Sequence, residues 1–132
     1  MQYLKTNHYR DKKLLKLAQG RMCLFQVPNV CFGIDPDTTV AAHSNESRHG
    51  KGKSIKAEDH YSAWACVSCH AWYDTSLDSR EDKRRAFELA HKRQVQAWDS
   101  ISESEQESAA DRETATRALI QIDKDEAFYA TR

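Results

Sequence analysis

The sequence has little glycine and proline and contains no long apolar run. Only four Gly and two Pro occur among 132 residues, which excludes collagen-like chains and Gly/Pro-rich disordered chains. No stretch approaches the roughly 18 uncharged apolar residues of a membrane span, and the first residues, MQYLKTNHYRDKK, lack the apolar segment of a signal peptide. We therefore expect one compact cytoplasmic domain with appended segments and no membrane partner, in a chain too short for a large multidomain enzyme.

The whole chain has no excess of positive or negative charge, but its two parts each have one. The 20 Lys and Arg residues balance the 20 Asp and Glu residues. Residues 1–98 nevertheless hold 16 basic and 11 acidic residues, a net charge of +5, whereas residues 99–132 hold four and nine, a net charge of −5. The change falls where the Ser/Glu/Ala-rich segment 99–116 begins, which has almost nothing to bury. We predict a basic domain over 1–98 and an acidic, partly helical or disordered tail over 99–132.

Apolar spacing predicts four helices around a short β region. Helices are expected over 9–19, ending at Gly20, from about Val67, over 81–98 and over 112–130. Segment 22–27 and the residues after Val30 are predicted as the strands of a hairpin, with a further strand over 38–43. Segment 44–60 contains two glycines, several basic side chains and no apolar period, and is predicted as a loop. The predicted fold class is therefore α+β.

Four cysteines, all in the basic part of the chain, indicate a metal site. Cys66 and Cys69 have the two-residue spacing of a zinc knuckle. Cys23 and Cys31 are separated by seven residues, a spacing that two short strands joined at Pro28 would bring together. Because the cytosol keeps thiols reduced, these residues are better explained as ligands than as disulfides. We expect a structural zinc ion held by the four thiols, with ordinary buried cysteines at 23 and 31 as the alternative.

The order of these motifs resembles that of the HNH, or ββα-metal, nucleases. Over roughly residues 21–75, a Cys pair is followed by a strand that ends in His43, a basic loop with glycines and the sequence CVSCH. More narrowly, GRMCLFQVPNVC, TTVAAH, GKG, KAED and CVSCHAWYD are similar to the YbcO-like family of small phage and prophage nucleases. The resemblance implies a small zinc-containing ββα-metal core with flanking helices. It also implies a metal-dependent endonuclease that acts on DNA in phage replication or recombination.

The resemblance gives roles to individual residues, and the chemistry of phosphodiester hydrolysis agrees with them. His43 would be the general base, because histidine has the only unperturbed side-chain pKa near neutrality. A bound Mg²⁺ or another divalent cation would neutralise charge that develops on the phosphate and the leaving oxygen. His70, together with Asp59 or Asp74, is expected to hold that ion. Phosphate contacts are expected from the cations of the loop, namely Arg48, Lys51, Lys53 and Lys56.

One position departs from the family pattern. HNH proteins usually carry an acidic or histidine ligand immediately before the general base, and here that residue is Ala42. His49 and His60 are candidates for the missing ligand, and either would alternatively join the zinc site. The vacancy favours a second hypothesis, a catalytically inactive, zinc-stabilised nucleic-acid-binding module. A third is a protein-interaction adaptor that uses the acidic tail, and a homodimer or contacts with phage or host recombination proteins are left open.

Overall fold

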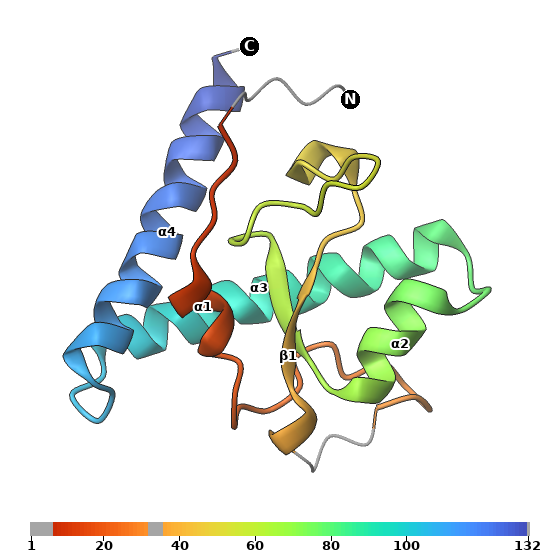
Figure 1. Cartoon of the computed structure of the whole chain (residues 1–132), viewed down its shortest axis with the longest axis horizontal. Coiled ribbons are helices and arrows are strands. Elements are labelled where there is room, and N and C mark those ends of the chain that lie inside the picture. Colours follow the sequence, from red (N-terminus) through yellow and green to blue (C-terminus); the bar gives the residue numbers. More distant parts are fainter. Residues whose placement is uncertain (1–6, 32–35, 132) are drawn as a thin grey trace.

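The computed structural model describes residues 7–31 and 36–131, which form a small β-hairpin surrounded by helices (Figure 1). In the hairpin, β1 (Val40–His43) and β2 (Ser62–Ala65) pair antiparallel, with Val40 opposite Ala65 and His43 opposite Ser62. Two 3-10 turns flank β1, η1 (Pro36–Thr38) before it and η2 (Ser47–His49) after it. The α-helices are α1 (Lys12–Lys16), α2 (Val67–Thr75), α3 (Arg80–Glu103) and α4 (Ala109–Ala130). This mixed architecture confirms the predicted α+β class.

The helix α2 directly follows β2 and runs back along the hairpin. Cys66 is its N-cap, and the Cys66 thiol accepts a hydrogen bond from the Cys69 amide at 3.5 Å. Because Ala65 pairs with Val40, the helix begins at the end of the hairpin where β1 starts. Its later turns lie beside His43, at the opposite end. A single short helix therefore spans both ends of the hairpin.

The helix α3 covers the hairpin through one face. Its buried side chains recur every three or four positions, as expected of an amphipathic helix: Phe87, Ala90, Gln94, Trp98 and Ile101. The buried Gln94 side-chain oxygen accepts a hydrogen bond from the Trp64 amide at 2.8 Å, so α3 also satisfies a polar group of β2 inside the core. The helix continues through Trp98 to Glu103 without a break. The division of the chain at Trp98 stays a prediction.

The helix α4 packs against α3 and α1 through small side chains. Its buried residues include Thr114, Ala115 and Ala118. The connection between α3 and α4 is held by Glu107, whose carboxylate accepts two hydrogen bonds from Arg21 at 2.8 and 2.9 Å. Within the described ranges, no helix is long and apolar enough to cross a bilayer.

The strand predicted over 22–27 is wrong. The Leu24 amide donates to the Trp64 carbonyl of β2 at 2.8 Å, but the Leu24 carbonyl accepts from the Arg93 guanidinium instead of extending the ladder. Gln26 and Asn29 have positive φ values of 49° and 64°, which interrupt an extended chain. The segment is therefore irregular, and it contributes apolar side chains to the core without forming a strand. The strand predicted after Val30 falls partly on residues 32–35, outside the described residues.

Two further elements differ from those predicted. The strand β2 was not predicted, because Ser62, Ala63, Trp64 and Ala65 are all buried and show no alternation of apolar and polar residues. The first helix is shorter than the predicted 9–19. It begins after its cap Asp11, and Gly20 adopts the left-handed conformation, with φ of 76°, in the turn that follows.

Candidate metal centre and candidate active site

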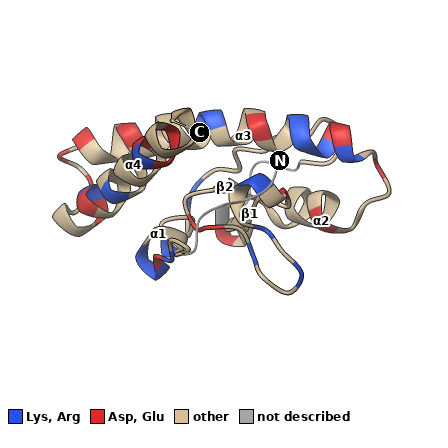
Figure 2. Ribbon diagram, turned by 90° about the horizontal axis from the view of Figure 1, so that it is seen from above, with Lys and Arg blue, Asp and Glu red and all other residues tan. Residues whose placement is uncertain are grey.

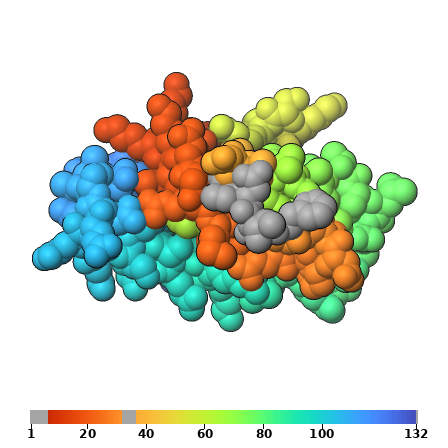
Figure 3. Space-filling model, turned by 90° about the horizontal axis from the view of Figure 1, so that it is seen from below, coloured from red at the N-terminus to blue at the C-terminus, as the bar shows by residue number. Residues whose placement is uncertain are grey.

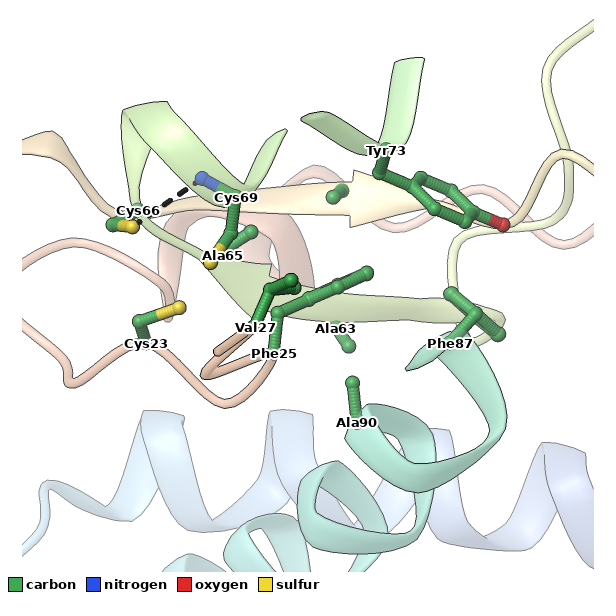
Figure 4. Close-up of a cluster of buried hydrophobic side chains, with 11 residues drawn as sticks. Cys23, Phe25, Val27, Ala63, Ala65, Cys66, Cys69, Tyr73, Phe87 and Ala90 are labelled. Atoms are coloured by element: carbon green, nitrogen blue, oxygen red, sulfur yellow. Dashed lines mark hydrogen bonds between the residues drawn. The ribbon is translucent and has the colours of Figure 1, made fainter. Parts of the chain in front are cut away.

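Four thiols meet where β2 ends and α2 begins. The sulfur atoms of Cys23, Cys31, Cys66 and Cys69 all lie within 4.8 Å of one another, and none forms a disulfide. Figure 4 shows those of Cys23, Cys66 and Cys69 facing a common space at one end of the core cluster. The Cys31 and Cys66 sulfurs are 3.9 Å apart. Four sulfurs bound to one zinc ion at about 2.3 Å would be separated by about 3.8 Å. The cluster therefore fits a tetrahedral ion such as zinc.

A tight turn brings Cys31 to this cluster. The amides of Val30 and Cys31 both donate to the Val27 carbonyl, at 3.1 and 2.9 Å. Asn29, which lies between Val27 and Val30 in this turn, takes up the left-handed conformation that such a turn favours. The expected approach of Cys23 and Cys31 to the knuckle is confirmed, but a turn replaces the predicted hairpin.

Burial makes the thiols difficult to ionise unless a cation is bound. Burial, together with the neighbouring Cys23, raises the pKa of Cys31 to about 11, and burial also raises the pKa of Cys69. At Cys66, burial opposes ionisation, but hydrogen bonds from the Cys69 amide and from the other thiols lower the pKa to about 7. Cys66 is thus easier to ionise than Cys31 or Cys69. A divalent cation would supply the positive charge that deprotonates the others.

The opposite end of the hairpin borders a charged hollow of about 390 Å³. Its lining consists of polar and charged side chains, namely His43, Ser44, Asn45, Lys51, Lys56, His70 and Asp74. The expected general base, two candidate metal ligands and two expected phosphate contacts therefore lie together. Ser44 and Asn45 were not predicted as site residues, although they directly follow His43 in the sequence.

Asp59, which is not among the residues that line the hollow, holds the His43 ring. The His43 Nε2 lies 2.9 Å from Asp59 Oδ1, while Asp59 Oδ2 accepts a hydrogen bond from the Asp11 amide at 2.6 Å. Burial by itself would raise the pKa of Asp59, but hydrogen bonds from His43 and from the Asp11 amide outweigh it and lower the pKa. An ionised Asp59 favours the imidazole form that carries its proton on Nε2, which leaves the lone pair on Nδ1. Asp59 is thereby suited to fix the ring.

The helix α2 brings His70 and Asp74 into the hollow. These residues are one turn apart, and His70 Nε2 lies 3.0 Å from Asp74 Oδ2. Both side chains are more than a third exposed, so an ion could reach them from solvent. Imidazole and carboxylate groups together suit several divalent ions. Ala42, immediately before His43, is completely buried in the core and offers no further ligand.

His49 and His60 do not line the hollow. The His49 Nδ1 lies 2.6 Å from the Ser44 hydroxyl, and its ring stacks on Tyr61 with centroids 4.2 Å apart. Burial lowers the pKa of His49 to about 3, so this imidazole is neutral near pH 7. His60 is completely buried, with its Nε2 2.6 Å from Asp125 Oδ2 on α4. His60 therefore lies in the interior, whereas His49 is partly buried against Tyr61.

The four loop cations have different surroundings. Lys51 and Lys56 line the hollow. Arg48 pairs with Glu46 and Glu88 at 2.8 and 3.1 Å, so its charge is already opposed by two carboxylates. Lys53 is exposed, and the loop to which it belongs stands out from the body of the molecule (Figures 2 and 3). The lysines of the loop are therefore better placed than Arg48 to meet an external phosphate.

The segment before α1 supports the site from behind. The Asp59 amide donates to the Tyr9 carbonyl at 3.1 Å, and the Arg10 guanidinium donates to the carbonyls of Lys56 and Ala57 at 2.9 and 2.5 Å. These contacts join residues more than 45 positions apart, and no local motif in the sequence predicts them.

The sequence is similar to a described family and to a solved phage protein. It matches the model of the family described as "Putative nuclease YbcO" over residues 12–107. Among solved structures, it is similar to "a putative bacteriophage protein from Escherichia coli str. K-12 substr. MG1655", with 28% identity and a TM-score of 0.48 over 63% of this chain and 91% of that chain. No curated protein matches it. The family match includes β1, β2, α2 and all four cysteines, and it ends before α4.

Proposed function

The chain belongs to the YbcO nuclease family, and we propose that it is a metal-dependent endonuclease of the HNH type that hydrolyses DNA phosphodiester bonds. The observation that carries this proposal is the hollow in which His43, His70 and Asp74 lie together. The succession of β1, β2 and α2 and the four-thiol cluster beside α2 also support the HNH assignment. The proposed setting is phage DNA replication or recombination.

His43 is the proposed general base. Since its Nε2 is hydrogen-bonded to Asp59, Nδ1 is the nitrogen that takes a proton from water. The oxygen of that water then forms a bond to phosphorus, and the bond from phosphorus to the 3′ oxygen breaks. The departing 3′ oxygen takes a proton from solvent water, and His43 afterwards releases its proton to solvent. The products carry 5′-phosphate and 3′-hydroxyl ends. Asp59 is a positioning residue, because it contacts the imidazole and not the water.

His70 and Asp74 are the proposed holders of the catalytic ion, and their nitrogen and oxygen donors fit Mn²⁺, Mg²⁺ or a similar cation. Such an ion, when bound, neutralises charge on the phosphate and on the leaving oxygen. Lys51 and Lys56, in the same hollow, would hold the DNA backbone. A zinc ion in the four-thiol cluster would fix the start of α2 at Cys66, and so the positions of His70 and Asp74.

Cleavage of supercoiled plasmid DNA by the full chain tests this proposal. We expect nicking in Mg²⁺ or Mn²⁺, and a loss of at least about 100-fold in rate in His43→Ala, because the variant lacks its base. Its zinc content and melting temperature should match those of the wild type. His8→Ala removes an imidazole outside the hollow and should cleave normally. Undiminished cleavage by His43→Ala would refute the mechanism.

A zinc-stabilised nucleic-acid-binding module without catalysis is the second candidate. It is favoured by Ala42, whose buried methyl group stands where HNH proteins usually carry a ligand. This candidate predicts DNA binding that weakens steeply with salt, without cleavage in any divalent ion tried. Failure to bind DNA at low salt would exclude both candidates.

A further inference from the structure

The helix α4 contacts Asp11, the residue whose amide holds Asp59 beside His43, although α4 lies beyond the residues that match the family. We propose that α4 positions the general base of the cleavage site, through a chain of contacts from Arg117 to Asp11, from Asp11 to Asp59, and from Asp59 to His43. The proposal rests on the proposed function, because it takes His43 as the base. It assigns Arg117 as a positioning residue that never touches the substrate.

The first link joins α4 to the segment before α1. The Arg117 guanidinium donates to Asp11 Oδ2 from Nε at 3.2 Å and from Nη2 at 3.1 Å. The Tyr9 hydroxyl donates to the same oxygen at 2.7 Å, and Asp11 Oδ1 accepts from the Leu14 amide at the start of α1. Because the Asp11 side chain is only 9% exposed, these partners take the place of water around its carboxylate. Arg117 supplies the positive charge among them.

The second link joins Asp11 to the base. The Asp11 amide donates to Asp59 Oδ2 at 2.6 Å, and His43 occupies the other oxygen at 2.9 Å. The Asp59 backbone is fixed at the same place, since its amide donates to the Tyr9 carbonyl. An imidazole bound to one oxygen of a carboxylate whose other oxygen is held by a backbone amide keeps one tautomer and one orientation.

A second contact from α4 fixes the neighbouring residue. His60 follows Asp59 directly, and its Nε2 lies 2.6 Å from Asp125 Oδ2. The Gln121 amide donates to the other Asp125 oxygen at 3.2 Å. Arg117 and Asp125 are eight residues apart, about 12 Å along the helix. A shift of α4 would therefore move both Asp11 and His60, and with them the carboxylate on which His43 rests.

The ring nitrogens of His43 provide a test that does not depend on activity. In full-length protein with ¹⁵N-labelled histidine, we expect the wild-type His43 to show the Nε2-protonated tautomer by NMR. Arg117→Met should give a mixture of tautomers and a kcat about tenfold lower, with KM changed less than about twofold. Arg117→Lys should recover most of both. Lys124→Met removes the same charge from an exposed position of α4 and should change neither.

A double-mutant cycle tests the route of the effect. If α4 acts through Asp59, Arg117→Met should have little further effect on kcat in an Asp59→Asn background. A full tenfold effect in that background would overturn the route. His43 nitrogen shifts identical in Arg117→Met and wild type would overturn the positioning role whatever the cleavage assay shows. Altered shifts in a protein that never cleaves DNA would support the positioning role and refute the proposed function.

Discussion

The two ends of the β1–β2 hairpin assemble their polar side chains in opposite ways. At the Val40–Ala65 end, four thiols close around a common centre and are largely withdrawn from solvent. At the His43–Ser62 end, side chains line an open hollow, and one of them, His43, is hydrogen-bonded to Asp59. The closed end suits an ion that remains bound. The open end suits a substrate that must enter and leave.

The helix α2 connects these two ends. Its cap Cys66 belongs to the thiol cluster, while His70 and Asp74, one and two turns later, line the hollow. Loss of the ion at the closed end should therefore disturb the open end, whereas changes at the open end should leave the closed end intact. This asymmetry can be tested by mutation.

The largest effect is expected at the closed end. Cys66→Ser keeps a residue able to cap α2 but removes one thiolate from the cluster. We expect loss of bound zinc, a fall of more than about 4 kcal/mol in the free energy of unfolding, and loss of cleavage as a consequence. Metal analysis and urea unfolding measure the first two. The control is Ser68→Ala, a change within the same knuckle, which should retain its zinc. A Cys66→Ser protein with full zinc content would show that the cluster is no metal site.

A smaller and more selective effect is expected at the open end. Asp74→Asn removes a carboxylate that is 48% exposed, so the free energy of unfolding should change by less than about 0.5 kcal/mol. Zinc content should stay the same. Cleavage should fall by about 10- to 100-fold and require more divalent cation, since one ligand is weakened. Asp99→Asn, an exposed carboxylate of α3, is the matched control. Loss of zinc in Asp74→Asn would contradict the separation of the two ends.

The closed end was the easier of the two to predict from the sequence. The spacing of Cys66 and Cys69 is local, and one turn of backbone determines how their sulfurs converge. The support of the open end depends on long-range contacts instead. His43 meets Asp59 from 16 positions away, and Asp59 is held by Asp11 from 48 positions away. No spacing rule relates such residues, so the contact between Asp59 and His43 was not predicted, and Asp59 was expected as a metal ligand.

The fold was predictable where periodicity and caps agreed. The helices α2 and α3 begin close to the predicted residues, each after a residue whose side chain caps the first turn. β2 was missed because its four residues are buried on both faces. The helix α4 was predicted over 112–130, and its Ala118, Leu119 and Ile122 pack in the core as apolar spacing indicates. The burial of Thr114 and Ala115 was not predicted, because these small side chains form no apolar stripe. In both elements several buried positions hold small side chains, which hydropathy does not reveal.

The smallest expected effect concerns the histidines packed behind the open end. Burial lowers the pKa of His49 to about 3 and that of His91 to about 4, from an ordinary value of 6.5. Below pH 6.5 the unfolded chain binds protons at these residues and the folded chain does not. Their contribution to stability is therefore present above pH 6.5 and is lost as the pH falls toward 4. Glu58 acts in the opposite sense, because burial raises its pKa to about 7, and its contribution is lost as the pH rises through 7.

His91→Gln separates this effect from acid release of zinc. Glutamine can still donate to the His60 carbonyl, which His91 Nε2 contacts at 2.7 Å, but it does not titrate. We expect the free energy of unfolding, measured in urea at several pH values, to fall less steeply between pH 6.5 and 4 in the variant. The pH at which zinc is released should not change, because that depends on the thiols at the closed end. If the free energy of unfolding falls equally steeply with pH in the variant, His91 does not cause the acid sensitivity. If zinc is released at a different pH in the variant, the two ends of the hairpin are coupled through α3 as well as through α2.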